Sequence, residues 1–199
     1  MTKTRRRGAE LDAAIYEATR SILENEGLAQ LTFAKVAAAA GTSKPVIYRH
    51  WQSPFELALL AVQDKIKTDN NGRLDELELT GTSLSADLFQ TFKRFTFSTD
   101  AFGKSFVLSF NGLNDEQNKQ LQVMINEAKQ IDINAIDHVV ARAQARHELA
   151  TGKLDDALKL MPFEWLRYRI FMNETITDED LTKLIDGMLV PAYRQALAK

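Results

Sequence analysis

The chain has 199 residues, a formal net charge of −2 and 45% hydrophobic residues, which is typical of a globular protein with one or two domains. It contains no cysteine, and this excludes a disulfide framework and a cysteine-ligated metal site. Its apolar runs are too short to span a membrane. The basic N-terminus MTKTRRRGAELDAA has no apolar stretch behind it, unlike a secretory signal, so we expect a cytoplasmic protein with no membrane partner.

The charge is distributed unevenly along the chain. Residues 1–67 carry ten Lys/Arg and seven Asp/Glu, a net charge of +3, whereas residues 68–199 carry fifteen and twenty, a net charge of −5. A basic segment can approach phosphates and an acidic one is repelled by them. The N-terminal third is therefore the better candidate for binding nucleic acid.

Nearly every segment predicts a helix, and alternating β-branched runs with hairpin turns are missing. The first helix is expected over residues 10–26, and Gly27 suits its C-terminal cap. Thr32 can cap a second helix over 33–40, after which Gly41 permits a sharp turn. Thr42 or Ser43 offers the next N-cap oxygen, and Pro45 lies at the start of a third helix.

Ser53 is expected to cap a fourth helix that has Pro54 at its first position and runs to about residue 68. Asn70-Asn71-Gly72 then predicts a break. Further helices are expected at about 84–98, 101–111, 115–149, 154–174 and 178–197. The prediction is an all-α protein of about nine helices, with an N-terminal domain over residues 1–68, the candidate for binding nucleic acid, and a larger domain over 69–199.

The third helix presents side chains suited to DNA. Ile47 and Trp51 are expected to face the first two helices, which leaves one face of the helix free to enter a major groove. On that face Lys44 and Arg49 can bond to guanine edges or phosphates, and Pro45 and Val46 offer apolar surface for a thymine methyl. Tyr48 and His50 suit phosphates. The alternative is a solvated helix that carries these side chains without a partner.

The segment LTFAKVAAAAGTS, the proline-initiated helix ending in Tyr-Arg-His-Trp and the leucine-rich helix after it resemble the DNA-binding domain of TetR-type transcriptional regulators. The resemblance covers residues 10–62. It implies a helix-turn-helix reader joined to an all-helical ligand-binding and dimerisation domain, most often in a repressor. The expected DNA-binding residues are Thr32, Lys35, Thr42, Ser43, Lys44, Pro45, Val46, Tyr48, Arg49 and His50; the resemblance places Thr32 and Lys35 near the DNA backbone.

One position departs from the family pattern. The family commonly has a lysine at the start of the fourth helix to grip a phosphate, and this chain has Pro54 there. We expect Gln52, the Ser53 hydroxyl or the free N–H groups of the helix terminus to replace it. Residues 5–7, three arginines, are either a flexible arm that contacts DNA or a solubilising tail.

Seven of the 11 phenylalanines lie between Phe89 and Phe110. Aromatic rings can line a cavity for a flat or aliphatic ligand, although ordinary core packing is as good an explanation for any one ring. An apolar or aromatic small-molecule effector is the resulting hypothesis. The candidate ligand-binding residues are Phe92, Phe106, Phe110, Met124, Trp165 and Tyr168.

The final helix is expected to begin with a capping box, Thr177-Asp178-Glu179-Asp180. It then has more apolar residues than one small domain needs, and the family resemblance implies a homodimer built from the last two helices of each subunit. A two-fold dimer suits a palindromic operator on double-stranded DNA. The candidate interface residues are Leu181, Leu184, Ile185, Met188 and Leu189.

Two competing classes of protein remain. The first is a helical small-molecule-binding protein or an enzyme with an incidental helix-turn-helix, and the second uses its helix-turn-helix for protein contacts only. With three histidines and no Gly-rich phosphate loop, the chain offers no catalytic or metal site, so we expect neither an enzyme nor a cofactor.

Overall fold

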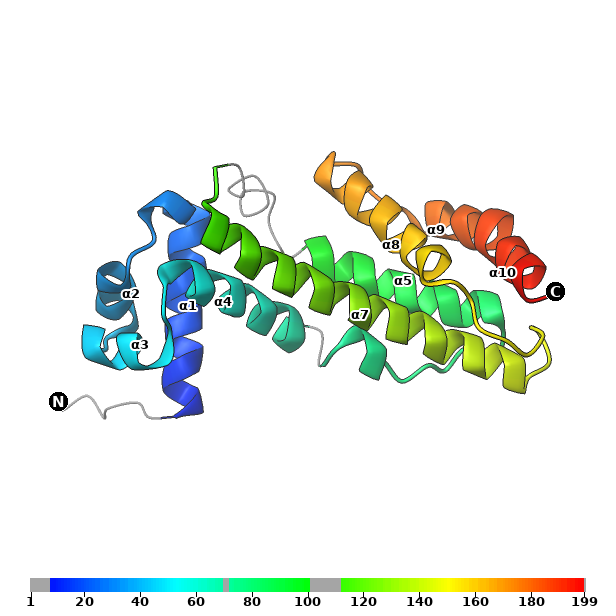
Figure 1. The fold of residues 1–199 in the computed structure, drawn as a ribbon, viewed down its shortest axis with the longest axis horizontal. Coiled ribbons are helices and arrows are strands. Elements are labelled where there is room, and N and C mark those ends of the chain that lie inside the picture. Colours follow the sequence, from blue (N-terminus) through cyan, green and yellow to red (C-terminus); the bar gives the residue numbers. More distant parts are fainter. Residues whose placement is uncertain (1–7, 70–71, 101–111, 199) are drawn as a thin grey trace. The chain divides into compact units, whose positions relative to one another are not determined.

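The computed structural model describes residues 8–69, 72–100 and 112–198 (Figure 1). Within these residues every regular element is helical, which confirms the all-α prediction. The expected helix at 101–111 and the arginines at 5–7 lie outside the described residues. The helices are α1 (Ala9–Glu26), α2 (Phe33–Ala40), α3 (Lys44–His50), α4 (Pro54–Asp69), α5 (Leu84–Asp100), α7 (Asp115–Ala145), α8 (Asp156–Phe171), α9 (Asp178–Leu184) and α10 (Val190–Leu197).

The chain divides into two compact units. Of the described residues, unit 1 comprises 8–68 and 112–124, and unit 2 comprises 69, 72–100 and 125–198. The first division falls between Thr68 and Asp69. Unit 1 also includes the first part of α7, which the expected domains, 1–68 and 69–199, had assigned to the second.

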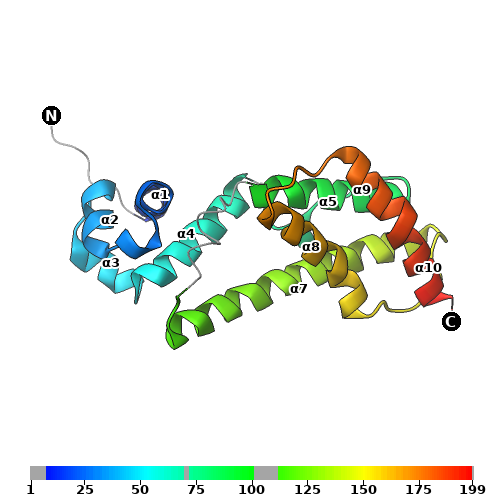
Figure 2. The ribbon, with the colours of Figure 1, turned by 90° about the horizontal axis from the view of Figure 1, so that it is seen from above.

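Unit 1 is built around the apolar face of α1, with α2 and α3 packed to one side of it (Figures 1 and 2). Ile15 of α1, Val36 of α2 and Ile47 of α3 are fully buried together with Leu57 of α4. Arg20 links α1 to α4, since its Nη1 donates to the carbonyl of Ala61 at 2.9 Å and to Oδ2 of Asp64 at 3.1 Å. Four short helices thus share one core.

Unit 2 has an aromatic centre contributed by α5 and α8. The ring of Phe163 meets Phe92 edge-on at 5.2 Å and Phe95 at 5.0 Å. Ile136 and Val139 of α7 and Tyr193 of α10 are buried in the same cluster. Figure 2 shows α8 and the last helices alongside α5 and the C-terminal half of α7.

Several predicted helix ends are confirmed, and others are shifted by a few residues. Thr177 Oγ1 accepts from the backbone N–H of Asp180, whose carboxylate accepts from the N–H of Thr177, so the capping box is confirmed. The expected helix 115–149 ends earlier, at Ala145, because the chain turns at His147 with a φ of 62°. The expected helix 154–174 starts at Asp156 and ends at Phe171. Pro162 lies inside α8 and does not end it.

The expected last helix, 178–197, is helical throughout but not uniformly α. A π-helical turn, Ile185–Leu189, separates α9 from α10. Pro191 follows directly in the first turn of α10, where its missing N–H removes one helical hydrogen bond. Widened turns of this kind adjust which side chains face inward, and here Asp186, Gly187 and Met188 are exposed while Ile185 and Leu189 are buried.

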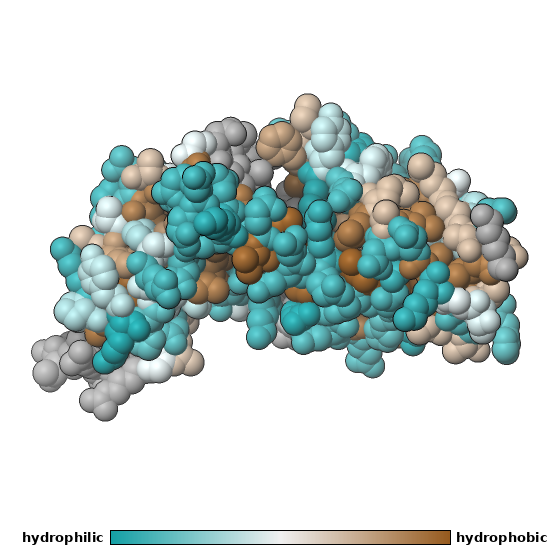
Figure 3. Space-filling view, in the orientation of Figure 1, coloured by the Kyte–Doolittle hydropathy of each residue, from teal (hydrophilic) through white to brown (hydrophobic). Residues whose placement is uncertain are grey.

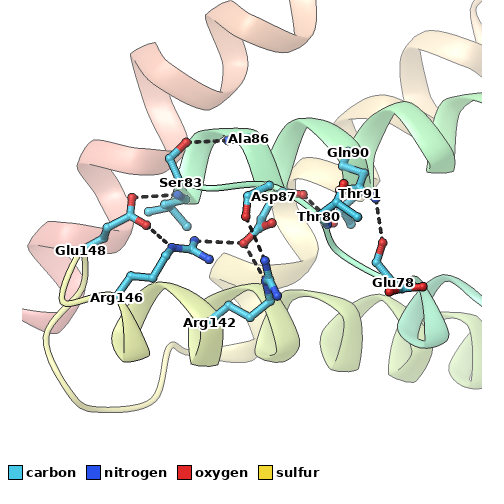
Figure 4. A network of polar contacts seen from close by, with 12 residues as sticks. Glu78, Thr80, Ser83, Ala86, Asp87, Gln90, Thr91, Arg142, Arg146 and Glu148 are labelled. Carbon is cyan, nitrogen blue, oxygen red and sulfur yellow. Dashed lines mark hydrogen bonds and ion pairs between the residues drawn. The ribbon is translucent and has the colours of Figure 1, made fainter.

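A buried polar network ties the start of α5 to the end of α7 (Figure 4). Asp87 is fully buried, and its Oδ2 accepts from Nε of Arg142 at 3.0 Å and Nη2 of Arg146 at 2.9 Å. Arg142 also donates to the carbonyl of Gly81 at 2.9 Å, and Arg146 to Glu148 at 2.6 Å. Glu148 accepts in turn from the backbone N–H of Leu84 at 2.8 Å, which caps the start of α5.

Candidate nucleic-acid interface

The turn between α2 and α3 has the conformation that the sequence predicts. Thr32 Oγ1 accepts from the backbone N–H of Lys35 at 3.3 Å and caps α2. Gly41 adopts a left-handed conformation, with φ 66° and ψ 34°, and the N–H of Thr42 bonds to the carbonyl of Ala37 at 2.9 Å. Glycine reaches this region without the steric cost that a Cβ imposes. The two helices therefore join in a tight turn.

The N-cap of α3 is Ser43, but its hydroxyl does not cap the helix as expected. Pro45 has no N–H to donate, and the N–H of Val46 is bonded to the Ser43 carbonyl at 3.0 Å. The two positions whose N–H groups an N-cap side chain normally bonds, Pro45 and Val46, are therefore not left for the Ser43 hydroxyl. The Ser43 hydroxyl is exposed and remains available to a ligand.

α3 is divided into a buried and an exposed face. Ile47 is fully buried and Trp51 nearly so, as predicted. Lys44, Pro45, Tyr48, Arg49 and His50 are exposed, whereas Val46 is half-buried and offers less surface than expected. The exposed side chains lie on one element that is anchored by two apolar residues.

Tyr48 is an exposed aromatic with a fixed orientation. Its side chain is 63% exposed, yet its ring packs edge-on against Phe33 with the centroids 4.8 Å apart. Trp51 behind it makes a second edge contact, to Tyr16 of α1, at 5.9 Å. Such contacts hold the rings in place before any ligand arrives. The Tyr48 hydroxyl is thus presented outward from a rigid support.

The start of α4 is self-capped. Ser53 Oγ accepts from the N–H of Glu56 at 3.0 Å, and Oε2 of Glu56 accepts from the backbone N–H of Gln52 at 2.6 Å. This is a capping arrangement closed by a carboxylate. Of the groups expected to replace the family's phosphate-binding lysine, the Ser53 oxygen already accepts a hydrogen bond within the protein, whereas Gln52 is exposed and only its backbone N–H is bonded to Glu56.

Among the side chains predicted to bind an effector, Phe92 and Trp165 belong to one hydrophobic cluster of unit 2. Phe92 is fully buried in the core of unit 2, and Tyr168 is 59% exposed. Trp165 is half-buried, with the guanidinium of Arg169 stacked 5.0 Å from its ring. Met124 is half-buried in unit 1. Phe106 and Phe110 lie outside the described residues.

Four of the five residues predicted for the dimer interface are buried within the single chain. Leu181, Leu184, Ile185 and Leu189 pack in the core of their own unit. Met188 alone among the five is exposed, at 57%. The exposed apolar side chains near it in sequence are instead Tyr168, Phe171 and Met172 around the end of α8. Figure 3 shows hydrophobic residues on this face of α8 and the last helices, between hydrophilic ones.

Sequence reasoning also missed the buried charges of unit 2. Besides Asp87, Asp132 is buried and bonded to Arg167, whose guanidinium lies 5.1 Å from the centre of the Phe95 ring. Burial raises the pKa of Asp132 to about 6, although Arg167 opposes the shift. Lys159 is buried between Asp137 at 2.7 Å and Asp156 at 3.0 Å. No local pattern predicts the pairs of Asp132 with Arg167 and of Lys159 with Asp137, which are distant in sequence.

Comparisons with known proteins agree with the geometry of unit 1. Residues 15–59 match the family model of the tetR family of bacterial regulatory proteins. Uncharacterized HTH-type transcriptional regulators of Mycobacterium bovis and Mycobacterium tuberculosis are 26% identical over 191 residues, which cover 93% of this chain and 89% of theirs. No helix in the described part of the chain is long and apolar enough to cross a membrane.

Solved structures share the fold over most of the chain. A Rhodococcus protein assigned to the TetR family matches with a TM-score of 0.62 at 18% identity, over 96% of this chain and 100% of that one. The Bacillus subtilis regulator FadR, solved in complex with stearoyl-CoA, matches with a TM-score of 0.55 at 16% identity, over 92% and 97%. The matched domain identifies residues 15–59, with the helix-turn-helix in α2 and α3, as a DNA-binding domain of the tetR family, and over the remainder of the chain the solved structures of TetR-family regulators share its fold.

Proposed function

We propose that the protein acts in the cytoplasm as a homodimeric repressor, which a small apolar or aromatic effector releases from a palindromic operator. The observation that carries the DNA-binding part is the exposed face of α3, with Lys44, Tyr48 and Arg49 held outward on the buried Ile47 and Trp51. A helix of this kind fits the major groove, where Lys44 and Arg49 can donate to guanine edges and Tyr48 to a phosphate.

The test is a double substitution of the reading face, Tyr48→Ala with Arg49→Ala. Both side chains are exposed, so we expect the melting temperature to stay near that of the wild type while operator binding in a gel shift is lost. Lys67→Ala, an exposed lysine on α4, is the charge-matched control and should bind nearly as well as wild type. Unchanged operator binding by the double variant would refute the assignment of α3.

The dimer part of the proposal rests on exposed apolar side chains in unit 2. Tyr168, Phe171, Met172 and Met188 are each about half exposed or more, which is unusual for four large apolar residues at the end of α8 and in the π-helical turn Ile185–Leu189. A two-fold contact would cover the same patch on both subunits, and two reading helices would then meet the two halves of a palindrome. Light scattering should give twice the chain mass at micromolar concentration, and a monomer there would contradict this part.

The effector part follows from the aromatic composition of unit 2 and from a structural neighbour. The Bacillus subtilis regulator FadR holds stearoyl-CoA, a ligand with a long apolar chain. An effector acts only by preferring one arrangement of the dimer, and the preferred arrangement changes the separation of the two α3 helices. Mass spectrometry of the protein under native conditions should find a co-purified apolar compound that weakens the gel shift. Release by sugars or highly charged metabolites alone would contradict the apolar class.

A further inference from the structure

The helix-turn-helix has few cations with which to meet DNA. Residues 8–69 contain six Lys/Arg and eight Asp/Glu, so the domain without its N-terminal arginines is net negative. Between Thr32 and Ser53 the cations are Lys35, Lys44 and Arg49. Affinity for DNA comes largely from neutralised phosphates, so it matters whether each of these three cations is already paired with an acidic side chain.

Lys35 differs from the other two. Its Nζ donates to Oε2 of Glu26, at the end of α1, at 2.5 Å, and to Oε1 of Gln30, in the short turn Leu28–Gln30, at 3.4 Å. In the described part of the chain Lys44 and Arg49 have no ion pair of this kind. The pair of Lys35 and Glu26 is therefore close to neutral as a unit.

The position of Lys35 is one where a phosphate is expected. It lies in the first turn of α2, beside the capping Thr32, and in a helix-turn-helix the first helix crosses the DNA backbone. The pair is 40% and 44% exposed, so it is open to exchange with an ion from solution. A phosphate that approaches Lys35 meets a carboxylate that already holds the ammonium group.

We propose that Glu26 limits the DNA affinity of this protein by occupying Lys35 in the free state, so that a DNA phosphate must displace it. The inference rests on the proposed DNA binding through α2 and α3. Glu26 lowers the affinity for DNA indirectly, through its ion pair with Lys35, and its own carboxylate makes no favourable contact with DNA.

The experiment measures binding of the full chain to a fluorescein-labelled mixed-sequence duplex of about 30 base pairs, long enough for two half-sites, by anisotropy over a series of salt concentrations. The variants are Glu26→Gln, Lys35→Met and the combination of both. Glu24→Gln is the matched control, because Glu24 is an exposed acid on the same helix end with no ion pair in the described part of the chain. Thermal melting by circular dichroism checks that each variant is folded.

Glu26→Gln should bind roughly 1.5-fold to fivefold more tightly than wild type, the scale of one exposed ion pair. Because a phosphate reaches Lys35 in both proteins, the slope of log K against log salt should change by less than the value of about 0.9 that one additional phosphate contact would give, whereas Lys35→Met should flatten the slope by about 0.9. Glu24→Gln should leave the slope unchanged. In the Lys35→Met background, Glu26→Gln should gain no more affinity than Glu24→Gln does.

Two results would overturn the inference. One is an equal gain from Glu26→Gln with and without Lys35, which would show a general charge effect; the other is an unchanged affinity, which would make the pair purely structural. Failure of the proposed function looks different. In that case the wild-type protein itself shows no salt-dependent affinity for the duplex, whatever the variants do.

Discussion

Replacing Asp87 with alanine should destabilise the protein more than any exposed acidic substitution in the chain. The carboxylate is fully buried, and its Oδ2 accepts from both Arg142 and Arg146. Breaking a buried ion pair by removing one partner costs about 3–5 kcal/mol, since the remaining charge is left uncompensated. Here the Arg142 and Arg146 side chains are 33% and 26% exposed, so each can recover part of its hydration.

The free energy of unfolding of Asp87→Ala should therefore fall by about 3 kcal/mol, the lower end of this range. For a chain of this size that corresponds to a fall in melting temperature of roughly 6–12 °C. Chemical denaturation followed by circular dichroism measures the change in the free energy of unfolding. Asp87→Asn separates charge from shape, because the amide keeps the volume but carries no charge. Its NH₂ group would also lie where Oδ1 now has no hydrogen-bond partner, so we expect a loss of about 2 kcal/mol or more.

The matched control is Asp186→Ala in the same unit. Asp186 is exposed and accepts one hydrogen bond, from Ser85 at 2.7 Å, so its loss should cost below about 1 kcal/mol. If Asp87→Ala destabilised the protein no more than Asp186→Ala, the network in Figure 4 would contribute nothing to stability and the reasoning would be wrong.

Three further changes should alter the stability of the protein in a direction that follows from the structure. Gly81→Ala should cost more than about 2 kcal/mol by denaturant unfolding, because the new Cβ would lie 2.5 Å from Asp87 Oδ1 and 2.8 Å from its backbone nitrogen; wild-type stability would contradict this contact. Burial raises the pKa of Asp132 from 3.8 to about 6, so the folded state holds its proton more tightly and this group's contribution to stability falls as pH rises through that range. Relative to Asp132→Asn, the wild type should thus lose about 2.5 kcal/mol between about pH 4 and pH 7, and a constant difference would refute the shift. Glu56→Ala should destabilise the protein by about 1 kcal/mol by opening the cap on Gln52, whereas Glu56→Gln should largely keep it; equal losses in melting temperature would argue against the cap.

Local structure was predictable wherever its cause lies within a few residues. The cap at Thr32, the left-handed Gly41 and the capping box from Thr177 to Asp180 each depend on hydrogen bonds or backbone angles of neighbouring residues. The spacing of Ile47 and Trp51 likewise predicted which face of α3 is buried. The expected cap by the Ser43 hydroxyl is absent for a reason that is also local. Pro45 has no N–H to donate, and the N–H of Val46 is bonded to the Ser43 carbonyl.

Pairs that are distant in sequence could not be predicted in this way. Asp87 meets Arg142 and Arg146 only because α5 and α7 pack together, and Lys35 meets Glu26 only because α1 ends beside α2. Charged residues are frequent on helix surfaces, so their presence does not indicate which of them pair. The available partners depend on the packing of the helices.

The sequence by itself determined that this protein is all-helical and that α2 and α3 form a helix-turn-helix with Lys44, Tyr48 and Arg49 outward, because caps, turns and helical periodicity are short-range effects. Only the tertiary structure decided which apolar side chains of the last helix are core. Leu181, Leu184, Ile185 and Leu189 share the apolar character of Met188, yet they pack within unit 2 and Met188 does not. Burial depends on the helices that pack against a residue, and helical periodicity does not encode which helices those are.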